Sequence, residues 1–255
     1  MSAAWTRGEA CRAAAEPALA VEGISHRFGA VQALDAVSLT VPAGRVTALV
    51  GINGAGKTTL FNLVTRLYAA RSGRIAVCGH ELARTPRAAL AAMGVVFQSR
   101  ALDPTLTVRQ NLAYRGALYG MPRRAALTAG GAALERLGLA DRMATSLRAL
   151  SGGQARRVEI AAALMHAPRL LLCDEATVGL DLASRRALVA DIHRLAADTG
   201  VGVLWATHLM DEVEPGDRTV VLHRGRVLAE AEAAALAPDG DIGAAFLALT
   251  AQADA

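Results

Sequence analysis

The feature that most constrains this chain is a glycine-rich stretch at residues 51–58, GINGAGKT. It fits the pattern GxxxxGK[ST] through Gly51, Gly56, Lys57 and Thr58. A triphosphate is bound mainly by backbone N–H groups, and larger side chains at the glycines would hinder close approach or the unusual backbone angles. The stretch therefore predicts a phosphate-binding loop.

The residues on either side of this loop support the prediction. Residues 46–50, VTALV, form a short apolar run typical of a strand, and residues 59–68, TLFNLVTRLY, have helical spacing. The dinucleotide pattern GxGxxG is excluded because the glycines fall at positions 51, 54 and 56. The alternative, a glycine-rich turn without a ligand, requires the motif and both flanks to agree by chance.

Length and composition predict one α/β core with a side lobe. The 255 residues have a hydrophobic fraction of 53% and a mean hydropathy of +0.31. Every apolar stretch is interrupted well before the roughly 18 residues that a membrane-spanning helix needs. Cys11, Cys78 and Cys173 are widely spaced, so neither a disulfide framework nor a zinc site is expected, and a reducing compartment is predicted.

Charge argues against a nucleic-acid partner. The net charge is +4, but the arginines are interleaved with acidic residues and do not form a stripe. Solubility, or attraction to an anionic membrane surface, explains the basic balance equally well. Charged residues also interrupt residues 1–18 where a signal peptide needs an apolar segment, so we expect a flexible leader there.

Two early segments predict a small antiparallel sheet. Residues 19–25 and 36–41 roughly alternate polar and apolar side chains. Phe28 is expected in the loop between them, where its ring could stack on a purine base or, alternatively, cover the core. A later strand, residues 94–98, is expected to end in Gln98, whose amide oxygen could bind Mg²⁺ or a water, although a glutamine after a strand is ordinarily only a loop residue.

A helical lobe is predicted next, with helices at residues 107–119 and 123–137. It leads to LSGGQ at residues 150–154. Ser151 can cap the following helix, while Gly152 and Gly153 leave its first N–H groups bare. The sequence therefore predicts a second anion-binding helix terminus.

Buried strands at residues 170–174 and 201–207 are expected to carry polar groups at their ends. Asp174 can hold the hydration shell of Mg²⁺, and Glu175 can polarise a water for attack on a γ-phosphate. His208 can donate to a phosphate oxygen, although a histidine in that position is more often an ordinary loop residue. A final hairpin, residues 219–223 and 227–230, and an apolar helical tail complete the chain.

Taken together, GINGAGKT, Gln98, LSGGQ, LLLCDE at 170, VGLD at 178 and His208 make this chain resemble the nucleotide-binding subunit of ABC transporters. The resemblance implies an α/β fold, with a P-loop NTPase core of mainly parallel sheet, an antiparallel β subdomain and an inserted α-helical subdomain. The ATPase domain would span residues 19–230, with the helical subdomain at about 99–166. Residues 1–18 would be the leader and 231–255 a helical tail.

The resemblance also implies the role of each site residue. Phe28 would stack on adenine, Glu175 would be the general base and His208 the γ-phosphate switch. Asp181 matches a loop that crosses the interface between two subunits. Mg²⁺ would be held by Thr58 and Gln98 directly and by Asp174 through water. The phosphates of ATP would be bound by Gly51, Ile52, Asn53, Gly54, Ala55, Gly56, Lys57, Thr58 and Thr59. The signature residues acting on the ATP of the partner subunit would be Ser151, Gly152, Gly153 and Gln154.

Partners follow from the same resemblance. The chain is similar to ATPases of ABC-2-type exporters, and in particular to a branch that accompanies PQQ-dependent alcohol oxidation systems. Its expected partners are a separate membrane permease and a second copy of itself or a related ATPase subunit, at the cytoplasmic face of the inner membrane. The alternatives are a soluble ABC ATPase acting on ribosomes or DNA, and a regulatory subunit that binds ATP without hydrolysing it.

Overall fold

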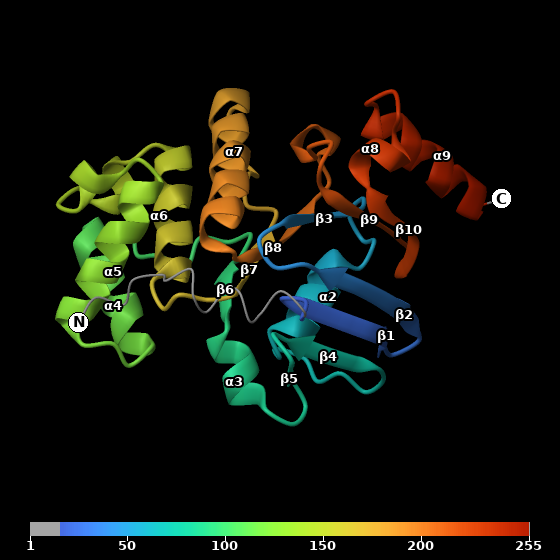
Figure 1. The fold of residues 1–255 in the computed structure, drawn as a ribbon, viewed down its shortest axis with the longest axis horizontal. Helices are drawn as coiled ribbons and strands as arrows, with labels where there is room; N and C mark the ends of the chain where they lie inside the picture. Colours follow the sequence, from blue (N-terminus) through green and yellow to red (C-terminus); the bar gives the residue numbers. More distant parts are fainter. Residues whose placement is uncertain (1–15, 255) are drawn as a thin grey trace.

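The computed structural model describes residues 16–254, and its frame is a large, mainly parallel sheet (Figure 1). Only β10 runs antiparallel to its neighbour in this sheet. The parallel strands carry almost continuous apolar sequence because both faces of the sheet are covered. In spatial order the strands are β10 (Arg226–Glu232), β9 (Arg218–His223), β3 (Val46–Val50), β8 (Gly202–Thr207), β7 (Leu170–Asp174) and β6 (Met93–Val96).

Alternate residues of the parallel strands face two different apolar clusters. Leu171 and Cys173 of β7 pack on the side of α6 (Gly152–Leu164) and α7 (Leu182–Thr199), whereas Leu170 and Leu172 pack on the side of α2 (Lys57–Val64). All five residues of β7 are buried, as the sequence predicted. This strand therefore carries its last residue, Asp174, out of a fully apolar interior.

The predicted antiparallel sheet is confirmed, with the order β2-β1-β4-β5. Its strands are β1 (Leu19–Phe28), β2 (Val31–Val41), β4 (Arg74–Val77) and β5 (His80–Glu81). The placement of Phe28 in a loop is wrong, because this residue ends β1 and pairs with Val31. A turn of only two residues joins the strands, and Gly29 adopts the positive φ of 57° that such a turn favours.

The helices that support the site include α2 (Lys57–Val64) and α7 (Leu182–Thr199), on opposite faces of the large sheet. The sequence predicted that the first of these would continue to residue 68. It ends at Val64 because Arg66 turns to a φ of 60°, outside the helical range, while Thr65 still bonds to the Phe61 carbonyl through its backbone N–H and its hydroxyl. The strand predicted to end in Gln98 also ends earlier, at Val96, so that Gln98 lies in the following loop.

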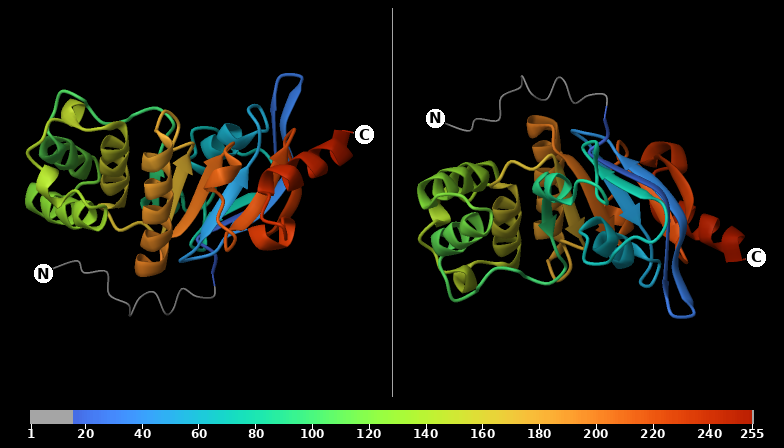
Figure 2. Two further views of the ribbon diagram at one scale, coloured as in Figure 1. Left: turned by 90° about the horizontal axis from the view of Figure 1, so that it is seen from above. Right: turned by 90° about the horizontal axis from the view of Figure 1, so that it is seen from below.

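A helical lobe extends from one end of the large sheet (Figures 1 and 2). It contains α4 (Val108–Leu118), α5 (Arg123–Arg136) and α6 (Gly152–Leu164), with the short turns η1 (Ala140–Arg142) and η2 (Leu147–Ala149). The predicted start of α4 is confirmed, because Thr107 and Gln110 cap it reciprocally. The inserted lobe, the parallel core and the antiparallel sheet together confirm the predicted fold class.

The remaining short elements are α3 (Pro86–Ala91), η3 (Met210–Glu212) and α8 (Ala233–Leu236). The chain then forms α9 (Ile242–Asp254), at the end of the molecule opposite the helical lobe (Figure 2). In the part of the chain that the structure describes, no helix combines the length and apolarity needed to cross a membrane. The predicted leader lies largely outside the described residues.

Candidate nucleotide-binding site

The phosphate-binding loop connects β3 to α2, as the sequence predicted. A Cβ atom on Gly51 would lie 2.6 Å from the Leu222 carbonyl oxygen, and one on Gly56 would lie 2.8 Å from that of Ala33. Gly56 also has a φ of 112° and no side chain that could cap α2. The helix therefore presents its first N–H groups to the loop, where an anion can bind them.

The ammonium group of Lys57 faces back along the loop. Its Nζ donates to the carbonyl oxygens of Gly51 at 2.6 Å and Ile52 at 3.3 Å. The same atom lies 3.4 Å from Glu175 Oε1, and the lysine side chain is almost completely buried. Lys57 thus supplies a buried positive charge between the loop and the carboxylate at the end of β7.

Glu175 is the centre of the site. The Nδ1 atom of His208 lies 3.1 Å from its Oε1, and Gln98 Nε2 donates to its Oε2 at 3.1 Å. Its backbone has a φ of 47°, a conformation that costs energy for a residue with a side chain and that is found at functional sites. The structure therefore brings together Lys57, Gln98, Glu175 and His208, from four separate parts of the sequence.

Asp174 lies beside this group but differs from it electrostatically. Its side chain is buried, and its Oδ1 has no hydrogen-bond partner among the described residues. Burial and, secondarily, the charge of Glu175 raise the pKa of Asp174 to about 6, although Lys57 opposes the rise. A buried carboxylate oxygen without a donor is a group that a cation or a metal-bound water would satisfy.

Phe28 belongs to an aromatic cluster that the sequence reading missed. Its ring packs edge-on against His26 at 4.7 Å and against Tyr68 at 5.6 Å between ring centres. The Phe28 side chain remains half exposed. Tyr68 follows α2 and is distant from Phe28 in the sequence, so only the antiparallel sheet folded over α2 brings these rings together.

The signature residues are not part of the Glu175 group. Ser151 and Gln154 form a reciprocal cap at the start of α6, which confirms the predicted N-cap. A Cβ atom on Gly153 would lie 3.1 Å from Ser184 Cβ, so the glycine permits close packing against the start of α7. This helix terminus lies in the helical lobe, whereas α2 lies under the large sheet (Figure 1).

Asp181 has a local role that the sequence reading did not assign. Its carboxylate caps α7 by accepting from the backbone N–H of Ser184 at 2.9 Å and from its hydroxyl at 2.7 Å. The hydrogen bonds from Ser184 lower the pKa of Asp181. An interface role for this residue remains a prediction from the sequence.

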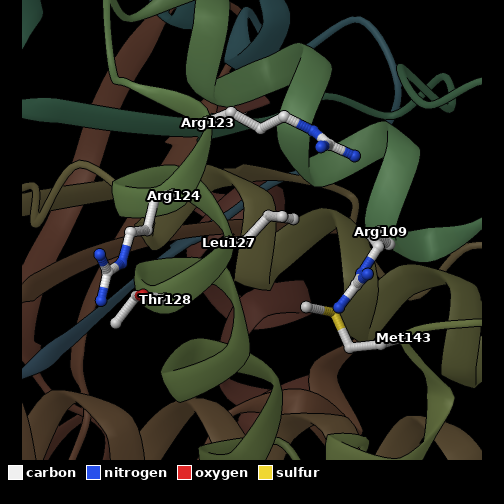
Figure 3. A pocket seen from close by; sticks show the side chains of 6 residues that line it. All are labelled: Arg109, Arg123, Arg124, Leu127, Thr128 and Met143. Atoms are coloured by element: carbon white, nitrogen blue, oxygen red, sulfur yellow. The ribbon is translucent and has the colours of Figure 1, made fainter.

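A separate hollow of about 510 Å³ lies on the helical lobe. Its walls come from α4, α5 and the residue after η1, and Figure 3 shows the guanidinium groups of Arg123 and Arg124 pointing in different directions. It is remote in sequence from the phosphate-binding loop and contains no carboxylate. The six lining residues are Arg109, Arg123, Arg124, Leu127, Thr128 and Met143.

The fold and the site define a P-loop protein that binds a nucleoside triphosphate. Residues 34–178 match the family described as "ABC transporter". The chain belongs to this family, as an ATP-binding subunit.

Named relatives agree with this assignment. The daunorubicin resistance ATP-binding protein DrrA3 of Streptomyces coeruleorubidus is 40% identical over 220 residues, covering 86% of this chain and 69% of the relative. The linearmycin resistance ATP-binding protein LnrL of Bacillus subtilis is 36% identical, over 83% of this chain and 68% of that protein. The structure of cbiO1 from Clostridium perfringens, described as part of an ABC transporter complex, has a TM-score of 0.80 at 27% identity, covering 91% and 95% of the two chains.

Proposed function

We propose that this subunit hydrolyses Mg·ATP and thereby drives export through a separate membrane permease. The observation that carries the proposal is the convergence of Lys57, Gln98 and His208 on the Glu175 carboxylate. A base must lie within hydrogen-bond reach of groups that can orient a water and stabilise developing charge. The four side chains meet this requirement, which disfavours a subunit that only binds ATP.

The chemistry assigned to the protein's own residues begins with Lys57. A triphosphate in the loop offers this ammonium group a more highly charged partner than Glu175, so the Glu175 carboxylate becomes free to accept a proton from water. Gln98 holds Oε2 of the carboxylate and His208 contacts Oε1, which fixes the orientation of the base. His208 is then placed to interact with the phosphate that is released.

Mg²⁺ fits the residues present. Asp174 contributes the unpaired buried oxygen, and Thr58 contributes an exposed hydroxyl at the start of α2. Gln98 can contribute its amide oxygen because its nitrogen is the atom that contacts Glu175. The metal, when bound, would neutralise phosphate charge, and its presence would relieve the cost of ionising Asp174.

We propose further that two subunits pair head to tail around ATP. The start of α2 and the start of α6 are both helix termini suited to anions, and they lie in different lobes of one copy. A second copy, or a related subunit, can offer its Ser151–Gln154 terminus to a nucleotide held by the first. Hydrolysis would then remove the phosphate that holds the two subunits together.

Export is supported by the names of two relatives, which are resistance ATP-binding proteins. The proposed partner is an ABC-2-type permease, with this subunit peripheral at the cytoplasmic face of the inner membrane. An association with PQQ-dependent alcohol oxidation systems, and the division of the chain at residues 18/19 and 230/231, remain predictions from the sequence. Recovery of the chain with a membrane protein from detergent extracts, and not with ribosomes or DNA, would distinguish this proposal from the soluble ABC ATPase.

The decisive test replaces Glu175 with glutamine, which preserves size and removes the base. We expect ATP turnover to fall by about 100-fold or more, while ATP binding is retained and the dimer persists in ATP. Phosphate release and nucleotide binding would be measured on purified protein. Glu135→Gln, an exposed change on α5, is the matched control and should hydrolyse normally. Normal turnover by Glu175→Gln would remove Glu175 as the base.

A further inference from the structure

A buried ion pair on α6 contacts the loop that carries Gln98. Arg156 and Glu159 lie one helical turn apart, and both are almost completely buried. Arg156 Nη1 donates to Glu159 Oε2 at 2.7 Å. Buried charges are costly unless they are paired and fully hydrogen-bonded, so the partners that complete this pair show what it holds in place.

Those remaining partners are backbone atoms of residues 97–101. Arg156 donates to the carbonyl oxygens of Phe97 at 2.9 Å and Gln98 at 3.0 Å. Glu159 Oε1 accepts from the backbone N–H of Ala101 at 3.0 Å. The loop is therefore fastened to α6 at both of its ends by charge-assisted hydrogen bonds, which are stronger than neutral ones.

The same helix begins at the signature. Ser151 caps α6, and Arg156 follows five positions later in the same rigid element. In the loop that α6 holds, the Gln98 side chain donates to Glu175. A continuous set of contacts thus runs from the signature, through α6 and the ion pair, to the carboxylate at the end of β7.

We propose that Arg156 and Glu159 are positioning residues that make the signature helix and the Gln98 loop move as one unit. When a nucleotide of a partner subunit binds the start of α6, the displacement reaches Gln98 and changes its hold on the Glu175 carboxylate. This inference rests on the proposed function, both on the role of Glu175 in hydrolysis and on the head-to-tail pairing. It adds a specific connection by which a nucleotide at the start of α6 sets the geometry around the Glu175 carboxylate of the same subunit.

The test uses Arg156→Lys, which keeps the charge and removes the planar fork that reaches two carbonyl oxygens and a carboxylate together. We expect kcat to fall between about 10-fold and 100-fold because the base is misplaced, with KM for ATP unchanged. Arg136→Lys is the control: it lies on α5 and donates only within its own helix. This variant should match the wild-type protein in both constants.

A double variant separates the proposed connection from a general structural effect. If Arg156 acts through Gln98, Arg156→Lys added to Gln98→Ala should lower kcat no further than Gln98→Ala alone. The proposal would be overturned if the fold-losses in kcat of the two single variants multiply in the double variant. An unchanged kcat in Arg156→Lys would also overturn it. Should Arg156→Lys fail to fold, Glu159→Asp is the substitute, because it retains the ion pair and shortens the reach to Ala101.

Hydrogen exchange gives a readout that does not depend on catalysis. In nucleotide-free protein, Arg156→Lys should speed exchange at the amides of residues 97–101, whereas Arg136→Lys should not. Unchanged exchange would refute the fastening of the loop. If the wild-type protein does not hydrolyse ATP, the proposed function fails, and the exchange result still decides whether α6 holds the loop.

Discussion

Single residues at the ends of β6, β7 and β8 decide what this subunit can do. Asp174 and Glu175 are adjacent acids, yet Asp174 Oδ1 has no partner while Glu175 contacts three side chains. The sequence motifs predicted that both acids would lie in the site. The motifs could not predict this difference, because it depends on burial and on side chains contributed by other strands.

The unpaired Asp174 leads to a prediction about pH. The folded protein holds the proton of this group up to about pH 6, compared with an ordinary value of 3.8. Because the folded pKa is raised, ionisation of Asp174 costs the folded state stability, and this cost builds up between pH 3.8 and pH 6 and is complete above pH 6. Asp174→Asn should therefore stabilise nucleotide-free protein at pH 8 by up to about 3 kcal/mol.

Urea unfolding without nucleotide or Mg²⁺ would measure this effect, and the difference from wild type should shrink as pH falls below 6 and disappear below the unfolded pKa of 3.8. Added Mg·ATP should reverse the ranking, since only the wild-type carboxylate can help to hold the metal. If Asp174→Asn is instead destabilised equally at high and at low pH, ionisation of Asp174 does not cost the folded state stability.

At the scale of elements, α7 is fastened to the segment before β9 by a histidine. His193 Nε2 lies 2.7 Å from Asp217 Oδ1, and Nδ1 lies 2.9 Å from the Val189 carbonyl oxygen. Burial alone would lower the pKa of His193, but the hydrogen bond and charge of Asp217 outweigh burial and raise the pKa. Protonation of His193 therefore strengthens the attachment of α7.

Because the folded pKa is raised, this contribution is complete below the unfolded value of 6.5 and is lost as pH rises through the folded pKa. His193→Gln should lower the free energy of unfolding by about 1–2 kcal/mol at pH 6, and by less at pH 9. Denaturant unfolding at the two pH values tests this expectation. His80→Gln, an exposed change on β5, should cost little at either pH; an equal loss in His193→Gln at both pH values would contradict the argument.

The elements themselves were largely predictable, and the exceptions have local causes. The buried strand β7 and the capped start of α6 follow from an apolar run and from Ser151 before the helix. The end of α2 could not be predicted in this way, because the positive φ of Arg66 stops a helix whose apolar spacing continues. The contact of Arg156 with the Gln98 loop was also missed, since an arginine and an acid three positions apart usually lie on a solvated face.

At the scale of the whole molecule, the two helix termini suited to anions belong to different lobes. This separation predicts that ATP joins two copies. In a Glu175→Gln background, cysteines placed at Ser151 and at Ile52, an exposed position of the phosphate-binding loop with an ordinary φ, should crosslink between copies when ATP is present and not when it is absent. All native cysteines would first be replaced.

The matched control moves the Ser151 probe to Arg136, an exposed position on α5 of the same lobe. This pair should give no ATP-dependent crosslink. If the Ser151 and Ile52 pair also gives none, although ATP is bound, the head-to-tail arrangement is refuted and the signature terminus must serve another purpose.

The contact between Lys57 and Glu175 bears on how the protein would respond to the ATP supply of a cell. Without nucleotide, Lys57 holds the Glu175 carboxylate, so under the proposed function an empty subunit has no free base. When ATP is scarce, more subunits would be empty, with the charges of Lys57 and Glu175 neutralising each other. The rate of ATP hydrolysis would then fall with the fraction of sites that hold ATP, without a dedicated inhibitor.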